Sequence, residues 1–196
     1  METIRRIAVY CGSSDGVDVS FGTLAYQLGK FLTENRIGVV YGGANIGLMG
    51  QVANGALDNG GFVIGVLPKF LKTKEIEHPN VSEIHIVDTM QERKFKMYEL
   101  ADGFLALPGG FGTMEELFEI LTWSQLGLHQ KPIGILNWNG FYHSLINQLQ
   151  RMVDDGFLKK SHYDLLKVYS NIETALKSFE LYSSPARTNW LTEDKL

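Results

Sequence analysis

Residues 107–119 read Leu-Pro-Gly-Gly-Phe-Gly-Thr-Met-Glu-Glu-Leu-Phe-Glu, and they are the most informative segment of the chain. The apolar run 103–107 predicts a buried parallel strand, and residues 108–110 predict a tight turn with few side chains. Thr113 is of a type that caps helices, so we expect a helix from Thr113 to Leu126. A strand, a glycine turn and a helix start together form a phosphate site, because unpaired backbone N–H groups and the positive end of the helix dipole face one point.

The rest of the chain alternates short β-rich runs with longer segments of helical periodicity. This alternation predicts right-handed βαβ units, and therefore a parallel sheet with helices on both faces. We expect a single α/β domain at 1–182, a doubly wound parallel sheet, with a C-terminal tail at 183–196. The expected strands are 7–11, 37–41, 62–67, 84–87, 103–107 and 132–136. The expected helices are 19–35, 48–59, 89–101 and 113–126, with C-terminal ones around 142–155, 163–166 and 172–181, and a loop over the site spans 68–81.

Three glycine-rich turns follow expected strands, at residues 12–16, 42–47 and 109–112. The carboxyl ends of parallel strands meet at one edge of a sheet, and ligands bind there, near a topological switch point. We therefore expect the three turns to converge on one nucleotide-like site. Ser13 and Gly43 are the residues of the first two turns that we expect to contact the ligand.

The composition is that of an ordinary soluble globular protein: 196 residues, of which 44% are hydrophobic and 20% charged. The net charge of −4 does not favour nucleic acid or an anionic membrane as a partner. The single cysteine, Cys11, excludes an internal disulfide and indicates a reducing compartment. Because the sequence shows neither a signal-peptide pattern nor a membrane-spanning apolar run, we expect a cytoplasmic protein.

Several familiar motifs are approached but not completed. Residues 12–16 match the G-x-S-x-G elbow of serine hydrolases, yet the following helix starts later than an elbow requires. We interpret these hydroxyls as groups that bind a ligand or shape the turn. No turn carries a complete dinucleotide fingerprint after a strand, and no P-loop sequence is present. The five histidines have no metal-ligand spacing, so we expect neither a metal nor a cofactor.

Glu116 has two explanations. Thr113-Met114-Glu115-Glu116 has the pattern of a capping box, in which Glu116 would accept a hydrogen bond from the Thr113 amide. Alternatively, a glutamate beside a phosphate site indicates chemistry on the part of the ligand next to the phosphate. The same pattern recurs at Thr89-Met90-Gln91-Glu92, where we favour a cap.

Arg93 and Lys94 follow in the early turns of the helix 89–101, where cations meet the positive end of the helix dipole. Near the carboxyl edge of the sheet they could engage an anionic ligand. A solvated basic pair is the alternative interpretation.

Several segments resemble the LOG (LONELY GUY) family of cytokinin riboside 5′-monophosphate phosphoribohydrolases. They are residues 9–14, 41–50, 90–94 and 108–116, and residues 123–132 extend the match. The resemblance reaches to about Phe157, and the Arg-Lys pair and the PGGxGTxxE motif are specific. It implies a Rossmann-like homodimer, or a larger homo-oligomer, that hydrolyses the N-glycosidic bond of a nucleoside 5′-monophosphate. The substrate would be AMP or an N6-substituted analogue, and the products a free base and ribose 5-phosphate.

The resemblance also implies which residues form the site. Arg93 and Glu116 are the catalytic pair. The implied substrate-binding residues are Glu75, Lys94, Gly110, Phe111, Gly112, Thr113, Met114, Glu115 and Thr122. Gln91 stands where many relatives have histidine, which leaves the base preference open.

Two other functions remain open. A non-catalytic carrier of a nucleotide or of a cofactor phosphate, like the molybdenum-cofactor carriers, would keep the phosphate site but would not need both Arg93 and Glu116. Relatives have also been described as lysine decarboxylases, but the sequence has no recognisable lysine context for pyridoxal phosphate.

Overall fold

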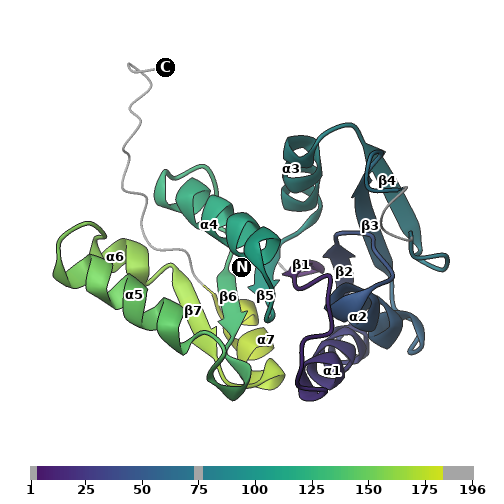
Figure 1. Cartoon of the computed structure of the whole chain (residues 1–196), viewed down its shortest axis with the longest axis horizontal. Helices are drawn as coiled ribbons and strands as arrows, with labels where there is room; N and C mark the ends of the chain where they lie inside the picture. Colours follow the sequence, from purple (N-terminus) through teal and green to yellow (C-terminus); the bar gives the residue numbers. More distant parts are fainter. Residues whose placement is uncertain (1–3, 73–76, 183–196) are drawn as a thin grey trace.

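The computed structural model describes residues 4–72 and 77–182, which form one α/β domain (Figure 1). Its seven-stranded sheet is entirely parallel, with the order β4-β3-β2-β1-β5-β6-β7. The strands are β1 (Arg6–Tyr10), β2 (Gly38–Tyr41), β3 (Val63–Pro68), β4 (Glu83–Val87), β5 (Gly103–Ala106), β6 (Ile133–Leu136) and β7 (Leu166–Tyr169). The helices are α1 (Ser20–Glu34), α2 (Gly47–Leu57), α3 (Met90–Leu100), α4 (Phe111–Gln125), the 3₁₀ turn η1 (Trp138–Gly140), α5 (His143–Asp154), α6 (Lys160–Tyr163) and α7 (Ile172–Glu180).

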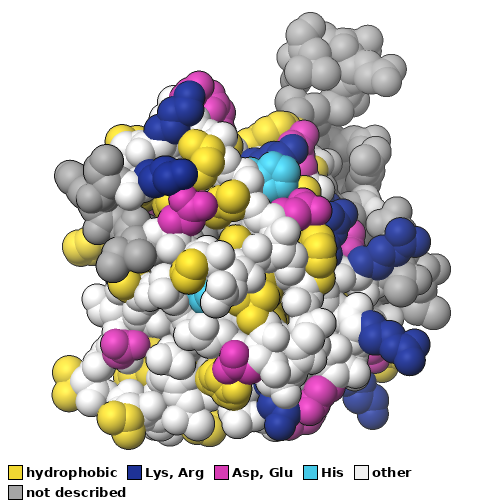
Figure 2. All heavy atoms as spheres, turned by 90° about the vertical axis from the view of Figure 1, so that its right-hand side faces the viewer, with side chains coloured by type: hydrophobic (Ala, Val, Ile, Leu, Met, Phe, Trp, Pro, Cys, Tyr) yellow, Lys and Arg dark blue, Asp and Glu magenta, His cyan; other side chains and the backbone are white. Residues whose placement is uncertain are grey.

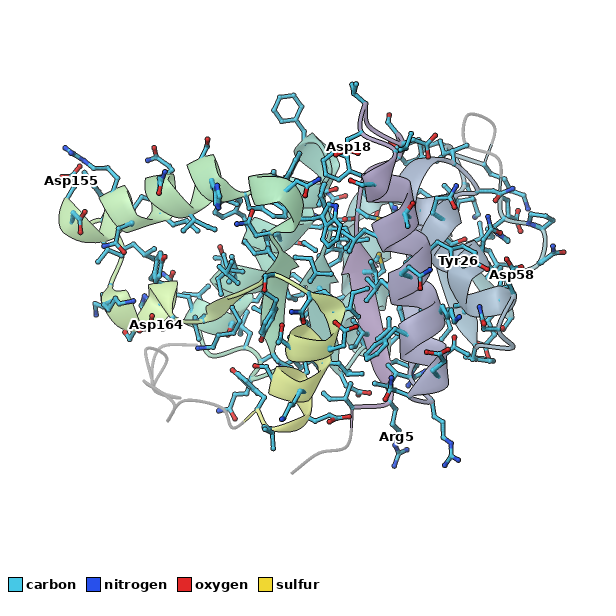
Figure 3. All side chains as sticks on the ribbon, turned by 90° about the horizontal axis from the view of Figure 1, so that it is seen from below. Arg5, Asp18, Tyr26, Asp58, Asp155 and Asp164 are labelled. Atoms are coloured by element: carbon cyan, nitrogen blue, oxygen red, sulfur yellow. The ribbon has the colours of Figure 1, made fainter. Side chains whose placement is uncertain are left out.

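Helices cover both faces of the sheet, as the alternating pattern predicts. One apolar cluster lies between the sheet and α1, α2 and α7, and a second lies between the sheet and α3, α4 and α5. Figure 3 views the first of these layers, in which the Tyr26 hydroxyl of α1 donates to Asp58 beyond α2 at 3.1 Å. Strands β2, β3, β5 and β6 are buried along their whole length, which explains their continuous apolar sequences.

The topological switch point lies between β1 and β5. From β1 the chain builds the sheet outward through β2, β3 and β4, and it then returns to add β5, β6 and β7 on the other side. Backbone contacts continue past the strand ends, since Leu107 N–H donates to the Tyr10 carbonyl at 2.9 Å and Gly12 N–H donates to the Pro108 carbonyl at 3.1 Å. The first and third glycine turns therefore lie against each other where a ligand is expected.

The predicted fold class is confirmed, and all six expected strands are present. The structure adds β7, which was missed, and the helix expected at 163–166 is wrong because α6 ends at Tyr163. Strand β7 is short, lies at the edge of the sheet and carries a lysine, so its sequence has no apolar run and its pairing with β6 decides its conformation. The tail at 183–196 lies outside the described residues, so the division between domain and tail stays a prediction.

The surface beside the β4 edge carries intermixed basic and acidic side chains (Figure 2). These include the ion pairs of Lys69 with Asp88 at 2.6 Å and of Lys72 with Glu77 at 2.9 Å. Among the described residues of this surface, basic side chains therefore alternate with acidic ones, unlike the continuous basic patch typical of nucleic-acid binding. Within 4–72 and 77–182, no helix combines the length and apolarity needed to cross a membrane.

Candidate active site

A cavity of about 370 Å³ opens at the switch point. The three glycine turns converge on it, as the sequence predicts, and α3 and the loop after β3 complete its wall. Its lining comprises Val9, Cys11, Gly12, Ser13, Gly42, Met49, Phe70, Leu71, Met90, Arg93, Gly110, Phe111, Gly112, Thr113, Glu115 and Glu116.

The N-terminus of α4 is open toward this cavity. Gly110 is the N-cap and offers no capping side chain, and the first helical hydrogen bond runs from Met114 N–H to the Gly110 carbonyl at 3.1 Å. The N–H groups of residues 111–113 therefore have no partner within the helix. A Cβ atom on Gly110 or Gly112 would meet no heavy atom within 4 Å, so both glycines border open space. This is the arrangement of an anion site at a helix N-terminus.

The expected helix start at Thr113 is wrong, and the capping box that was one explanation of Glu116 does not form. The helix starts at Phe111, so Thr113 lies inside its first turn and Glu116 lies in the second. Thr113 is buried against Gly109, where any Cβ atom would collide with the threonine side chain. The helix therefore begins directly after the glycine turn, two residues before Thr113, the residue whose type suggests a cap.

Glu116 is buried, with an exposed fraction of 8%, and it faces the cavity. Its carboxylate makes no hydrogen bond or ion pair with any described residue, so a structural role as a cap does not explain its presence. Burial raises its pKa to about 7, although the nearby Arg93 charge opposes this shift. A glutamate that ionises near neutral pH inside a cavity is suited to acid–base or electrostatic catalysis.

Arg93 is buried as well, with an exposed fraction of 6%, which excludes the interpretation of a solvated basic pair. Its guanidinium lies against Gly42, because a Cβ atom there would collide with Nη2. Its Nη1 contacts only the Met90 sulfur at 3.9 Å, and its Nε has no hydrogen-bond partner among the described residues. Glu116 is near enough to feel this charge but forms no hydrogen bond with it, so the unpaired Nε is available to an anionic or polar ligand.

Lys94 is buried but does not line the cavity. Its ammonium group donates to Glu119 at 2.9 Å and also to Glu115, so it joins α3 to α4. Its side chain is only 10% exposed.

The other predicted site residues fall into three groups. Ser13, the segment 110–113 and Glu115 line the cavity. Gly43, Met114 and Thr122 do not: Gly43 has a positive φ of 82° and packs toward β3, and the Thr122 hydroxyl donates to the Phe118 carbonyl at 2.7 Å. Glu75 lies outside the described residues.

Sequence reasoning missed several wall residues, notably Gly42, Met49 and Met90. Gly42 carried a signal, since it opens the second glycine turn, but only the structure shows that it makes room for Arg93. Met49 and Met90 carried no such signal, because apolar residues at helical spacing predict a hydrophobic core rather than a ligand site. Over the part of the chain that is described, no group of three histidine, cysteine, aspartate or glutamate residues is placed to hold a metal ion.

Known structures share this fold. The molybdenum cofactor binding protein of Rippkaea orientalis is 22% identical, with a TM-score of 0.68, and the match covers 90% of this chain and 95% of that one. The Moco carrier protein of Chlamydomonas reinhardtii is 21% identical with a TM-score of 0.66, over 89% and 94% of the two chains. At these identities the likeness concerns the fold alone.

Sequence relatives are much more similar. A family model described as possible lysine decarboxylase matches residues 49–179. The cytokinin riboside 5′-monophosphate phosphoribohydrolase LOG2 of Arabidopsis thaliana is 44% identical over 178 residues, which are 91% of this chain and 84% of that protein. The LOG enzyme of Oryza sativa subsp. japonica is 49% identical over 154 residues, 79% of this chain and 64% of that protein. The chain therefore belongs to the LOG family of cytokinin riboside 5′-monophosphate phosphoribohydrolases.

Proposed function

We propose that this protein hydrolyses the N-glycosidic bond of a nucleoside 5′-monophosphate, either AMP or an N6-substituted cytokinin riboside 5′-monophosphate. The observation that carries the proposal is Glu116: a buried carboxylate with no hydrogen-bond partner among the described residues, in one cavity with an open helix start and with the buried Arg93, whose Nε is unpaired over the same part of the chain.

The 5′-phosphate would bind at the start of α4. The N–H groups of residues 111–113 and the helix dipole supply the attraction, and Gly110 and Gly112 allow close approach. Glu116 lies one turn further along the same helix. A phosphate fixed at the helix start would therefore hold the ribose within reach of this carboxylate, and such positioning can contribute a large part of a rate enhancement.

Glu116 would act on the anomeric carbon. As the bond from C1′ to the base nitrogen breaks, its electrons leave with the base and positive charge develops on the ribose, as in glycoside hydrolysis. The Glu116 carboxylate can stabilise this charge and accept a proton from the water that forms the new bond to C1′. Arg93 would hold ribose or phosphate oxygens with its free donors and orient Glu116.

We propose a homodimer formed through the outer surface of α3 and α4. Phe95, Phe118, Leu126 and Leu128 are exposed there, more apolar surface than a helix facing water usually carries. Thr122 lies between Phe118 and Leu126 at helical spacing, about 9 Å along the helix from Glu116. In such a dimer, Thr122 would contact the substrate bound by the partner protomer. Light scattering that finds a stable monomer at micromolar concentration would contradict this assembly. We also propose a cytoplasmic location, which cell fractionation would test.

The decisive experiment incubates the protein with a panel of nucleoside 5′-monophosphates and measures free base. AMP or its N6-substituted analogue should be cleaved, and the matching nucleoside should react hardly at all, because the phosphate supplies the binding energy that catalysis uses. Equal rates on adenosine and AMP would contradict the phosphate site. Base release should be unchanged in Cys11→Ala, because Cys11 is buried and burial raises its thiol pKa. A chelator should not change it either, because the described residues hold no group placed to bind a metal ion.

The alternatives make different demands on the site. A carrier of phosphate groups gains nothing from a carboxylate in its cavity, which repels the cargo. A pyridoxal phosphate enzyme needs a lysine whose amine can lose its proton. No lysine lines the described part of the cavity, and the two glutamates raise the pKa of buried Lys94. Pyridoxal absorbance in the purified protein would revive the decarboxylase.

A further inference from the structure

Lys94 is one of the residues that the family resemblance places among the substrate ligands. In the structure Lys94 is absent from the cavity lining, and its ammonium group lies between the carboxylates of Glu115 and Glu119. This ion-paired group crosses from α3 to α4. The lysine side chain is 10% exposed, whereas Glu115 and Glu119 are 54% and 28% exposed.

Helix α4 carries three glutamates within little more than one turn, at 115, 116 and 119. On a helix, residues three apart are neighbours, so Glu119 lies beside Glu116 on the helix surface, and Glu115 adjoins it in sequence. Two further negative charges so close to Glu116 oppose its ionisation. With Lys94 the three-residue cluster of Lys94, Glu115 and Glu119 has a net charge of −1, and without it the charge would be −2.

We propose that Lys94 is a positioning residue, which anchors and neutralises the Glu115 and Glu119 carboxylates and thereby keeps Glu116 ionised for catalysis at neutral pH. This role rests on the proposed hydrolase function, but the effect of Lys94 on the pKa of Glu116 can be measured without any activity. It differs from substrate binding, in which the lysine would contact the nucleotide and the two glutamates would be bystanders.

Among the charged groups around Glu116, Lys94 is the one that counters the two neighbouring carboxylates. The ionisable groups that face it are Arg93 and Lys94 from α3, Glu115 and Glu119 on its own helix, and Tyr10 and Cys11 from β1. Burial raises the pKa of both Tyr10 and Cys11, so these two groups are neutral near pH 7. Arg93 also favours the ionised form of Glu116, but its charge is fixed and its donors are free for the substrate. Lys94 is the cation whose partners are the competing carboxylates.

The test titrates Glu116 by ¹³C NMR in protein labelled at the glutamate carboxyl carbons, with the resonance assigned by its loss in Glu116→Gln. In Lys94→Met, which keeps the apolar stem, the Glu116 pKa should rise by roughly one pH unit above that of the unmodified protein. The value of kcat/KM at pH 7 should fall roughly fivefold, since less of the enzyme carries an ionised Glu116, and it should recover by pH 9.

Two further variants sharpen the test. Lys96→Met is the matched control, because it removes the same charge from the same helix, at a lysine that pairs with Glu99 at 3.3 Å. It should leave the Glu116 pKa unchanged. Glu119→Gln keeps Lys94 in place and removes one competing carboxylate, so it should lower the Glu116 pKa. This variant tests the charge effect even if Lys94→Met does not fold. In the double variant Lys94→Met/Glu119→Gln the pKa should return toward its original value.

The outcomes separate the possibilities. An unchanged Glu116 pKa in both Lys94→Met and Glu119→Gln overturns the positioning role. A higher KM for AMP at every pH, with no change in the pKa, assigns Lys94 to the substrate instead and also overturns it. If the unmodified protein releases no base from any nucleotide, the proposed function fails, while the NMR titration still decides the role of Lys94.

Discussion

Helices α3 and α4 begin with the same Thr-Met-x-Glu pattern and use it in different ways. At α3, Thr89 is the N-cap: its hydroxyl accepts from the Glu92 amide at 3.1 Å, and the Glu92 carboxylate accepts from the Asp88 amide at 2.8 Å. At α4 the pattern starts inside the helix, and the N-cap is Gly110. One helix start is closed by its own side chains, and the other is left open beside a cavity.

The contrast shows when a helix start becomes a binding site. A missing cap costs about 1 kcal/mol, because backbone donors lose their partners. At α4 those donors face the cavity, so a ligand can recover the cost when it binds. The glycines before Thr113 make this possible, since Gly109 admits the threonine side chain and Gly110 leaves the space before the amides empty.

The two glutamates of the repeated pattern should respond very differently to the same substitution. Glu116→Gln should lower turnover on the order of 10²- to 10⁴-fold, because glutamine can neither carry the negative charge nor accept the proton. Glu92→Gln, at the matching position of α3, should leave turnover near normal, since glutamine can still accept from the Asp88 amide. Base release and melting temperature are measured on the same samples. An active Glu116→Gln protein would return the site to a binding function.

A second variant gives α4 the kind of cap that α3 has. Gly110→Asp is free of steric conflict, as Gly110 has φ −92° and open space around it. The new carboxylate should accept from the helix amides and raise stability by a few tenths of a kcal/mol. It should also repel the phosphate and lower kcat/KM for AMP by roughly 10- to 100-fold. Gly110→Ser is the uncharged control, with a smaller loss. A capped α4 with unchanged kinetics would mean that the phosphate binds elsewhere.

The pH dependence of catalysis should reflect Glu116 rather than Glu92. Burial raises the pKa of Glu116 to about 7, so the ionised form is present above pH 7 and is lost as the pH falls through this value. If the carboxylate is the active form, kcat at saturating AMP should fall about tenfold per pH unit below 7. Phosphate monoesters also lose a proton near pH 6, so kcat at saturating AMP is the quantity to compare. A rate that rises toward acid pH would make Glu116 an acid instead.

The repeated pattern also shows how far the sequence alone can lead. The cap at Thr89 was predictable because it depends only on neighbours in the chain. The parallel sheet and the convergence of the glycine turns were predictable because alternating strands and helices impose parallel strands whose carboxyl ends share one edge. The start of α4 did not, since it depends on how Thr113 packs against Gly109. Burial of Arg93 against Gly42 and the ion pairs of Lys94 join distant segments, and no short pattern encodes them. Strand β7 belongs with these, as its partner β6 lies some thirty residues earlier.

The smallest expected effect concerns the closed helix start. Thr89→Ala removes the hydroxyl that accepts from Glu92 N–H, so it should lower stability by about 1 kcal/mol and the melting temperature by roughly 2–4 °C. The backbone bond from Arg93 N–H to the Thr89 carbonyl, 3.1 Å long, does not need this side chain. Arg93 should therefore stay in place, and turnover at 25 °C should change less than twofold. If Thr89→Ala instead lowers turnover while the melting temperature stays constant, the start of α3 contributes to the site, and the two helix starts are more alike than their caps indicate.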